Sequence, residues 1–444
     1  MGKPTGFLDY TRVDCPLRDA AARTGDYAPV ELPLSERNRR RQSGRCMDCG
    51  VPFCQAGVSF EGVLLGCPLH NLIPEWNDLL WNGNYEGALQ RLLKTSPFPE
   101  FTGRVCPALC ERACICGQVS EPVTIRENEL SIIEYGFEND LMQPMPSAAR
   151  SDKKIAVIGS GPAGLSAAYY LNRRGHHVTV FEKDPLPGGL LTYGIPEMKL
   201  PKQIVARRVS LMEREGIRFR TSCCVGQQIG PEELAAQFDL VIFCCGAQQP
   251  RPLPFAETAG AFYALDYLRA SAQSLLEKTE PAVTASGKQV VLVGAGDSAS
   301  DCISTALRQD CRSITQLIRK PRTEQTEKRD HAHEEAEAVF GADIRRYETQ
   351  IERLVCGDDG AVNAVILQGS GEQLPCDLLL LASGFSGCEP ASLDAYEAVR
   401  KTGVPALTAG DMASGASLVV LAAASGKQAA AQADASLMGY TNIL

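Results

Sequence analysis

A glycine-rich turn that follows a short apolar run and opens a helical pattern occurs twice in this 444-residue chain. The first copy reads KIAVIG, GSGPAGLSAAYYLNRRG and HHVTVFE. The second begins at KQVVLVG (288–294), continues through GAGDSASDCISTALRQD and ends with SITQLIRK (313–320). Strand, turn, helix and strand in this order form the βαβ unit of a parallel sheet. The sequence therefore predicts two dinucleotide-binding folds in tandem.

The first turn has the spacing G-x-G-x-x-G, formed by Gly159, Gly161 and Gly164. The first glycine allows the tight turn, the second lets a pyrophosphate approach the backbone, and the third permits close packing of helix on strand. The helix N-terminus then offers N–H groups to the phosphates. Glu182 ends the second strand, where a carboxylate can accept hydrogen bonds from ribose hydroxyls. We expect a dinucleotide site here, with a plain glycine turn as the alternative.

The second turn repeats the pattern with Gly294 and Gly296, and Ala299 takes the third place, which accepts alanine. The strand that follows ends in Arg319 and Lys320 instead of an acid. A guanidinium or ammonium group at this point would pair with a 2′-phosphate, which favours NADPH over NADH. A solvated basic loop end is the alternative interpretation.

Two such sites in one chain have a natural use together. One holds a flavin, and the other admits a nicotinamide nucleotide that delivers hydride to it. This step needs alignment of two rings rather than a side-chain acid or nucleophile, so no catalytic side chain is predicted. His331 and His333 are expected to be surface residues of a helix.

The composition changes along the chain. A part rich in Cys, Pro and Trp comes first, the Pro-containing segment MQPMPSAARSDKK forms a linker, and the two dinucleotide units follow. The apolar run LLLLASG (378–384) is expected to return to the first unit. The predicted class is α/β, with two Rossmann-like domains, one inserted in the other, behind an all-α iron–sulfur domain. The expected ranges are 1–145 for the helical domain, 146–286 for the first part of the FAD domain, 287–374 for the NADPH domain and 375–444 for the rest of the FAD domain.

Composition limits the remaining classes. Hydrophobic residues make up 44% and charged residues 22%, as in folded globular proteins. The net charge of −9 disfavours nucleic acid as a partner. The longest apolar stretches, such as residues 418–424, are shorter than the about 18 residues of a membrane span. The N-terminus has no apolar signal region, so we expect a cytoplasmic protein without a membrane partner.

Cysteine is abundant, at 18 residues, for a chain expected in a reducing compartment where thiols do not pair. Eight of them form a cluster in the first third: Cys46, Cys49, Cys54, Cys67, Cys106, Cys110, Cys114 and Cys116. Short loops let successive thiolates point at one centre, and both iron–sulfur clusters and zinc accept such ligands. Zinc has no redox chemistry, whereas a flavin can pass single electrons to iron–sulfur clusters. The sequence therefore favours iron–sulfur.

Longer motifs extend over nearly the whole chain: GKPTGFLDYTR, RCMDCGVPFC, GCPLHNLIPEWNDL, FPEFTGRVCPALCE, EPVTIRENE, GGLLTYGIPEMKL, GDSASDC and AGDMASGASLVVLAAASGKQAA. Together they resemble the small (beta) subunit family of bacterial NADPH-dependent glutamate synthase. The resemblance implies a helical domain with two 4Fe-4S clusters, followed by an FAD domain that an NADPH domain interrupts.

The resemblance also implies ligands for the clusters, by similarity to the related domain of dihydropyrimidine dehydrogenase. One cluster would use Cys46, Cys49, Cys54 and Cys114. The other would use Cys67, Cys106, Cys110 and, in place of a fourth cysteine, Glu129. Carboxylate is an unusual ligand for such a centre, and Cys116 is the rival for this fourth position.

The same comparison assigns residues to the two nucleotides. FAD would contact Gly159, Gly161, Gly164, Glu182, Gly189, Leu190, Gly410 and Asp411. NADPH would contact Gly294, Gly296, Asp297, Ser298, Arg319 and Lys320. The stretch 321–334 departs from the family pattern, which leaves open the contacts on the nicotinamide side, including any role of Arg329 or His333.

The implied activity is electron input to glutamate synthase. NADPH would reduce FAD, and the clusters would carry electrons to a large amidotransferase subunit that makes L-glutamate from glutamine and 2-oxoglutarate. Three alternatives stay open: a related reductase that serves ferredoxin, sulfur or another subunit; an assembly subunit that keeps its cofactors for stability alone; and a zinc-stabilised binding module.

Overall fold

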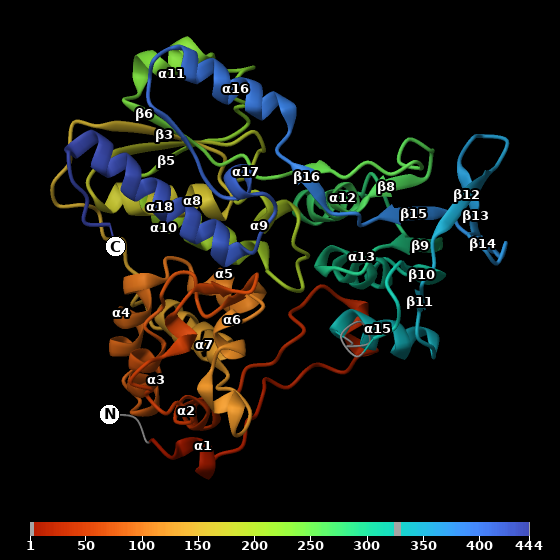
Figure 1. Cartoon of the computed structure of the whole chain (residues 1–444), viewed down its shortest axis with the longest axis horizontal. Coiled ribbons are helices and arrows are strands. Elements are labelled where there is room, and N and C mark those ends of the chain that lie inside the picture. The colour runs from red at the N-terminus through yellow and green to blue at the C-terminus, as the bar shows by residue number, and fades with distance from the viewer. Residues whose placement is uncertain (1–3, 324–329, 444) are drawn as a thin grey trace.

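The computed structural model, which describes residues 4–323 and 330–443, consists of a helical N-terminal region and two regions built on parallel sheets (Figure 1). The N-terminal region contains α1 (Gly6–Asp9), α2 (Glu36–Ser43), α3 (Ile73–Trp81), α4 (Tyr85–Thr95), α5 (Pro99–Val105), α6 (Leu109–Arg112) and α7 (Ile125–Glu138), with single 3-10 turns η1 (Ala22–Gly25), η2 (Phe53–Gln55) and η3 (Ile115–Gln118). The expected all-α domain differs in one respect, because β1 (Val58–Phe60) and β2 (Val63–Leu65) form an antiparallel hairpin. Within the described part of the chain, no helix has the length and apolar character needed to cross a membrane.

The first sheet has the order β17-β6-β3-β4-β5, with all neighbours parallel. Its strands are β3 (Lys154–Ile158), β4 (His177–Phe181), β5 (Arg218–Arg220), β6 (Leu240–Phe243) and β17 (Ala406–Thr408). Both faces are covered, as the nearly continuous apolar runs of a parallel sheet require. One face carries α8 (Pro162–Arg173), α10 (Lys202–Arg214) and α18 (Val419–Met438), and the other carries α11 (Pro231–Gln237) and α16 (Pro390–Lys401).

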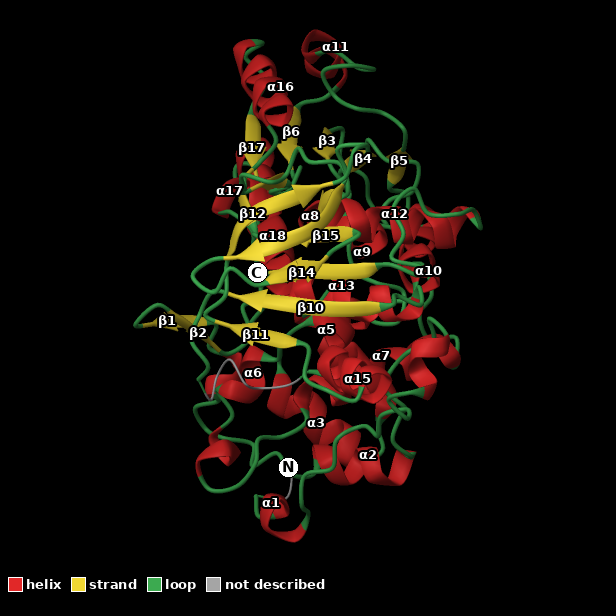
Figure 2. Cartoon of the chain, turned by 90° about the vertical axis from the view of Figure 1, so that its right-hand side faces the viewer, coloured by secondary structure: helices red, strands yellow, loops and turns green. Residues whose placement is uncertain are grey.

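The second sheet has the order β11-β10-β9-β15-β8 and is also parallel. Its strands are β8 (Ala261–Tyr263), β9 (Gln289–Val293), β10 (Ser313–Ile318), β11 (Arg345–Tyr347) and β15 (Leu378–Leu381). Helices α12 (Ala264–Glu277), α13 (Asp297–Arg308) and α15 (His331–Phe340) cover one face. The other face packs on an antiparallel layer, toward the viewer in Figure 2, of β12 (Ile351–Cys356), β13 (Val362–Leu367) and β14 (Gln373–Pro375).

The second sheet is inserted in the first, as expected, but its limits differ from the predicted ones. The chain leaves the first sheet through β7 (Gln249–Pro250) and returns through β16 (Phe385–Gly387), and these strands pair with each other. Leu378 pairs with Val290 of β9, so the run at 378–384 completes the second sheet and not the first. An apolar strand that ends in glycine fits either sheet, and only the pairing partner decides between them.

The helical region and the first sheet share their cores. Phe98 and Phe101 of the helical region lie in the core of the first sheet, and Val420 of α18 lies in the core of the helical region. At this boundary the buried Arg208 donates hydrogen bonds of 2.5 and 2.9 Å to the buried Glu100 carboxylate. These two parts of the molecule therefore form one packed body.

Helix α18 crosses α8 in close contact because Gly426 lies at the crossing point. A Cβ atom at Gly426 would lie 2.1 Å from the backbone oxygen of Ala163. The facing positions Ala429, Ala430 and Ala433 are buried and small. Alanine and glycine at these positions let the two helix backbones approach closely.

We expect Gly426→Ala to destabilise the protein by about 2 kcal/mol, because the added methyl group meets backbone that cannot move without displacing α8. By helix propensity alone, alanine in place of glycine would stabilise the helix by about 1 kcal/mol. The sign of the change in the free energy of unfolding therefore shows whether packing or helix propensity dominates. Thermal unfolding followed by circular dichroism measures the effect. Gln428→Ala, on the exposed face of the same helix, is the control and should stay within about 0.5 kcal/mol of the parent. A stabilised Gly426→Ala variant would contradict this account.

Candidate functional site

A cavity of about 1010 Å³ lies between the two sheets and the helical region. Its wall includes the first glycine turn, the start of α13 and Cys106 of the helical region. The volume is at the upper end of the about 300–1,000 Å³ typical of ligand pockets. Open parallel sheets bind ligands beyond the carboxyl ends of their strands, which is where the turn after β3 lies. The cavity is therefore the candidate site.

The first glycine turn has one open position. A Cβ atom at Gly159, where φ is +95°, would lie 2.5 Å from the carbonyl oxygen of Cys244. At Gly164 it would lie 1.9 Å from the carbonyl oxygen of Gly159. At Gly161, directly before α8, it would meet nothing within 4 Å. Only the middle glycine thus leaves room for a group that approaches the backbone, as a pyrophosphate site needs.

Glu182 lies buried beside this turn and lines the cavity. Its carboxylate accepts hydrogen bonds from the backbone N–H groups of Ser160 at 3.0 Å and Asp184 at 2.9 Å. Gly189, at φ +54°, comes so near Gly161 that a Cβ atom would lie 3.0 Å from its Cα. Leu190, the first residue of α9 (Leu190–Tyr193), lines the same wall.

Gly410 and Asp411, the last two residues predicted to contact FAD, differ in position: only Asp411 lines the cavity. Gly410 is outside the cavity wall, and its φ of +65° brings it so near α8 that a Cβ atom would lie 2.6 Å from that of Ala163. Asp411, at the start of α17 (Asp411–Ser414), lines the cavity, and burial raises the pKa of its carboxyl group. Gly164 is likewise a packing position and does not line the cavity.

The second glycine turn repeats this geometry. A Cβ atom at Gly294, where φ is +131°, would lie 2.5 Å from the carbonyl oxygen of Ala382, whereas one at Gly296 would meet nothing within 4 Å. Ala299 is fully buried. Asp297 and Ser298, at the start of α13, line the cavity.

The basic pair Arg319 and Lys320 lies apart from the cavity wall. Both side chains are exposed at the carboxyl end of β10, directly after Ile318. Gly294 and Gly296 are also outside the wall. The structure thus places the start of α13 in the cavity and leaves the basic pair on open surface beside it.

A network of side-chain hydrogen bonds, which was not predicted from the sequence, supports the second glycine turn. Gln316 of β10 is buried and donates a hydrogen bond of 2.8 Å to the carbonyl oxygen of Gly294. His333 lies 2.9 Å from Gln316 Oε1 through Nε2, and 2.7 Å from Asp330 Oδ1 through Nδ1. His333 was expected to be a surface residue of a helix, and this expectation is wrong, because both of its ring nitrogens have side-chain partners. The signal in the sequence was the glutamine in the middle of the apolar strand SITQLI.

Asp330 is held in its charged form. Burial alone would raise the pKa of Asp330, but hydrogen bonds from His333 and Ser300 outweigh it and keep that pKa below its usual value. His331 lines the cavity, and its side chain is 44% exposed. Arg329, the other residue left open on the nicotinamide side, lies outside the described residues, as do 324–328.

Ion pairs connect the two sheet regions across the cavity. Lys199, from the segment GIPEMKL, pairs with the buried Asp301 of α13. Burial alone would lower the pKa of Lys199, but the charge of Asp301 outweighs it and raises that pKa. Arg269 of α12 pairs with Asp184 beside the first turn. These two ion pairs join residues far apart in the sequence, so the spacing of the glycine motifs could not predict them.

The thiols of the helical region lie in two groups. The first contains Cys46, Cys49, Cys54 and Cys114, whose charges act on one another, and they line one small apolar pocket. Burial raises the pKa of Cys46 to about 12. Cys116 belongs to this same neighbourhood, where its hydrogen bond lowers the pKa of Cys114 to about 6.

The second group contains Cys67, Cys106 and Cys110, and Glu129 of α7 faces all three. Burial raises the pKa of Glu129 to about 7. Its Oε1 atom accepts a hydrogen bond of 2.5 Å from Thr102. The structure therefore brings Glu129, and not Cys116, to the second thiol group.

The backbone around both groups suits iron–sulfur clusters. Asp48, His70 and Ala108, each within three residues of a cysteine of these two groups, have φ of 51°, 53° and 55°, a strained region that side chains rarely adopt. Backbone N–H groups of residues 69 and 71 point to Cys67, and those of 108 and 109 to Cys106. Hydrogen bonds to sulfur are a common feature of iron–sulfur sites.

The spacing of the thiols also bears on zinc. In the described ranges, the single set of three metal-binding side chains with ligand atoms mutually within 4.8 Å is Cys15, Glu31 and Glu127, outside both thiol groups. Four thiolates on one zinc ion would lie about 3.8 Å apart, given bonds of about 2.3 Å. No three thiols of either group have sulfur atoms mutually within 4.8 Å in the part of the chain that the structure describes.

Comparison with known proteins decides the family. A pyridine nucleotide-disulphide oxidoreductase model matches residues 153–403, and a model of dihydropyrimidine dehydrogenase domain II, 4Fe-4S cluster, matches residues 23–141. The NADPH glutamate synthase small chain of Bacillus subtilis is 41% identical over an alignment of 488 positions, which covers 99% of each chain. The chain belongs to the glutamate synthase small-chain family.

Other relatives show how widely this family's construction is used. The NADH glutamate synthase of Schizosaccharomyces pombe is 36% identical and covers 99% of this chain, which corresponds to 23% of that protein. The putative oxidoreductase AegA of Escherichia coli is 32% identical over 92% of this chain and 67% of its own. As a member of the glutamate synthase small-chain family, the chain is an oxidoreductase, and the resemblance and fold class expected from its motifs are confirmed.

Proposed function

We propose that the chain is the electron-input subunit of an NADPH-dependent glutamate synthase. FAD supplies the conversion of a two-electron hydride donor into single electrons, which iron–sulfur clusters relay. The observation that carries the proposal is the shared cavity, whose wall contains the first glycine turn, the start of the second dinucleotide helix, and Cys106 of the second thiol group. Residues proposed to bind the two nucleotides and a cysteine proposed to bind a cluster thus line the same cavity.

The residues of this cavity divide the work between two nucleotides. On the FAD side the N–H groups at the start of α8 would hold the pyrophosphate, Glu182 would orient the ribose, and Asp411 would contact the ribityl side. The proposed FAD set is Gly159, Gly161, Gly164, Glu182, Gly189, Leu190, Gly410 and Asp411, in which Gly164 and Gly410 would act by packing from outside the cavity wall. On the NADPH side the start of α13 would hold the pyrophosphate, and Arg319 and Lys320, on the surface beside the cavity, would pair with the 2′-phosphate. The full NADPH set is Gly294, Gly296, Asp297, Ser298, Arg319 and Lys320.

Two 4Fe-4S clusters occupy the thiol groups in this proposal. Cys46, Cys49, Cys54 and Cys114 hold one, and Cys67, Cys106, Cys110 and Glu129 hold the other. Burial raises the pKa of these thiols, except that of Cys114, so for the other six cluster binding and thiol ionisation would occur together. The electrons leave to a large subunit that forms L-glutamate from glutamine and 2-oxoglutarate. The compartment is the cytoplasm, where reducing conditions keep thiols available.

A second candidate is a reductase of the same construction with another acceptor. The similarity to the putative oxidoreductase AegA favours it, because that relative has the same arrangement over most of this chain. Co-purification of the native chain with a large glutamine-hydrolysing subunit would decide for glutamate synthase. If no such large subunit co-purifies under conditions that preserve the complex, the second candidate is favoured.

The chain purified without oxygen should show a flavin band above broad absorption from iron–sulfur clusters, and NADPH should bleach part of both. It should reduce artificial acceptors with NADPH at a rate that glutamine and 2-oxoglutarate leave unchanged, because the proposal assigns both substrates to the large subunit. Visible spectra and acceptor assays measure this. A preparation without iron and sulfide, or a flavin that stays oxidised under excess NADPH, would reject the proposal.

Gly161→Val and Gly296→Val form a matched pair, because each fills the open position of one glycine turn. We expect Gly161→Val to lose most of its bound flavin. Gly296→Val should keep flavin and lose NADPH affinity by at least tenfold. Flavin content per chain and the NADPH dependence of flavin bleaching measure the two effects. The reverse pattern, or equal effects on flavin content, would show that the two sites are wrongly assigned.

The fourth ligand of the second cluster can be tested with Glu129→Ala and Cys116→Ser. We expect Glu129→Ala to lower iron content from about eight to about four atoms per chain, because the second thiol group then has only three ligands. Cys116→Ser should keep the full content. Iron and sulfide analysis, with electron paramagnetic resonance of the reduced protein, measures this. Loss of iron in Cys116→Ser alone would assign the ligand to Cys116.

A further inference from the structure

An N-terminal arm, residues 11–34, leaves the helical region and reaches the second sheet region (Figure 1). Its two legs pair with each other, since Arg18 N–H donates to Val30 O at 3.0 Å and Leu32 N–H donates to Pro16 O at 2.7 Å. The tip contains η1, which lies against α13 and α15. The arm thus bridges two regions that the sequence separates by about 300 residues.

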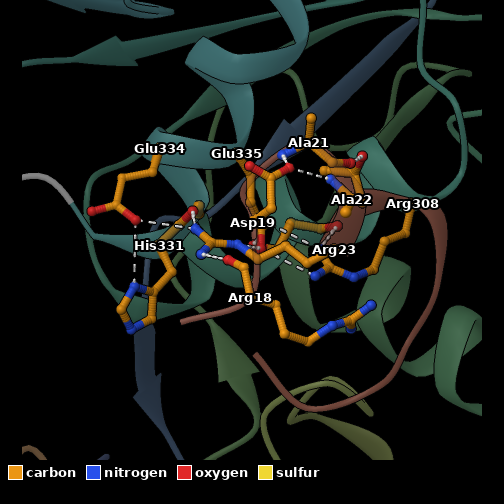
Figure 3. Close-up of polar contacts among 12 residues, drawn as sticks. Arg18, Asp19, Ala21, Ala22, Arg23, Arg308, His331, Glu334 and Glu335 are labelled. Atoms are coloured by element: carbon orange, nitrogen blue, oxygen red, sulfur yellow. Dashed lines mark hydrogen bonds and ion pairs between the residues drawn. The ribbon is translucent and has the colours of Figure 1, made fainter. Parts of the chain in front are cut away.

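Arg23 at the tip inserts between these helices (Figure 3). Its side chain is 1% exposed, and Nε donates a hydrogen bond of 2.8 Å to Oε1 of Glu335, which is fully buried. Nη2 donates to the backbone oxygen of His331 at 2.9 Å, and Nη1 donates to that of Arg18 at 3.2 Å. A buried guanidinium with this many partners has one position only.

Glu335 does not depend on the arm for its charge balance. Arg308 of α13 donates to both of its oxygens, at 2.8 and 3.1 Å, and Ser304 donates at 2.8 Å. Arg308 Nε in turn donates to the backbone oxygen of Asp26 at 2.8 Å. The socket for Arg23 is therefore formed by the second sheet region itself, and the arm enters it as a separate piece.

The root of the arm is held as firmly in the helical region. Glu127 of α7 accepts hydrogen bonds of 3.1 Å from Cys15 N–H and from Arg39. Glu31 on the returning leg pairs with Arg126 at 2.7 Å. Arg126 and Glu127 lie three and two residues before Glu129, on the helix that faces the second thiol group. Residues 29–34 also form part of the cavity wall.

We propose that the arm is an interdomain brace in which Arg23 is a positioning residue for the start of α13. The brace fixes the helix that carries Asp297 and Ser298 relative to the helical region that carries the thiol groups. Its effect on nicotinamide alignment rests on the proposed function, whereas the brace itself does not. Arg23 touches no reacting group and acts through α13 and α15.

The test is Arg23→Met in the purified holoprotein, with Arg18→Met as the control on the same arm. Arg18 pairs with Asp26, a partner that is 47% exposed, and enters no socket. Amide hydrogen exchange should rise at least tenfold in residues 331–340 and in the arm tip of Arg23→Met, and stay unchanged in α3, α4 and α8. Arg18→Met should resemble the parent, and Arg23→Lys should recover part of the protection. Unchanged exchange in Arg23→Met, or an equal rise in Arg18→Met, overturns the brace.

A second readout separates the brace from the proposed function. At saturating NADPH, Arg23→Met should bleach flavin about tenfold more slowly, with NADPH affinity within twofold of the parent, because the glycine turn is intact but displaced. If Arg23→Met does not fold, Tyr27→Phe replaces it, since the Tyr27 side chain lies close to Ser271 and Gln309 at the same interface. Tyr27→Phe should then raise exchange in the arm tip severalfold, and no rise overturns the brace. If exchange rises in Arg23→Met but NADPH does not bleach the flavin of the parent protein, the proposed function is rejected and the brace is kept.

Discussion

The rest of the structure depends on the contact between α18 and α8. This contact brings the last long helix of the chain against the helix that begins at the first glycine turn, and Gly426 makes the approach possible. The same α18 places Ala430 in the core of the first sheet, and Val420 and Ala423 in the core of the helical region. One helix therefore closes two cores. Separating the helical region from the first sheet would expose apolar surface on both sides, at about 25 cal/mol for each Å².

The thiol groups add a different constraint, because their backbone is held in conformations that cost free energy. Left-handed φ values at Asp48, His70 and Ala108 each cost about 1–2 kcal/mol relative to ordinary backbone. Burial adds the cost of ionising the thiols. Metal binding would offset the cost of ionising these thiols, since ligation releases protons and supplies charge at the same place. In the proposed function, the two clusters would bind beside this strained backbone.

Spacing in the sequence predicted the parts of the site that a local backbone requirement dictates. Gly159, Gly161 and Glu182 were identifiable because a tight turn, an open approach and a strand end each demand one residue type. Contacts between distant segments were not, because nothing near Glu335 in sequence indicates Arg23, which lies 312 positions away. The same reason explains the misplaced run at 378–384. An apolar strand carries its composition but not the identity of its neighbours.

The regions are joined in two physically different ways, and this difference limits how they can move. The helical region and the first sheet are joined by apolar packing, which is continuous and resists displacement in every direction. The second sheet region is joined by the β7–β16 ribbon and by ion pairs such as Lys199 with Asp301. The arm adds an attachment at some distance from the ribbon, through Arg23, and this attachment opposes rotation of the second sheet region about the ribbon. The position of α13 over the cavity is therefore set jointly by the first sheet and by the helical region.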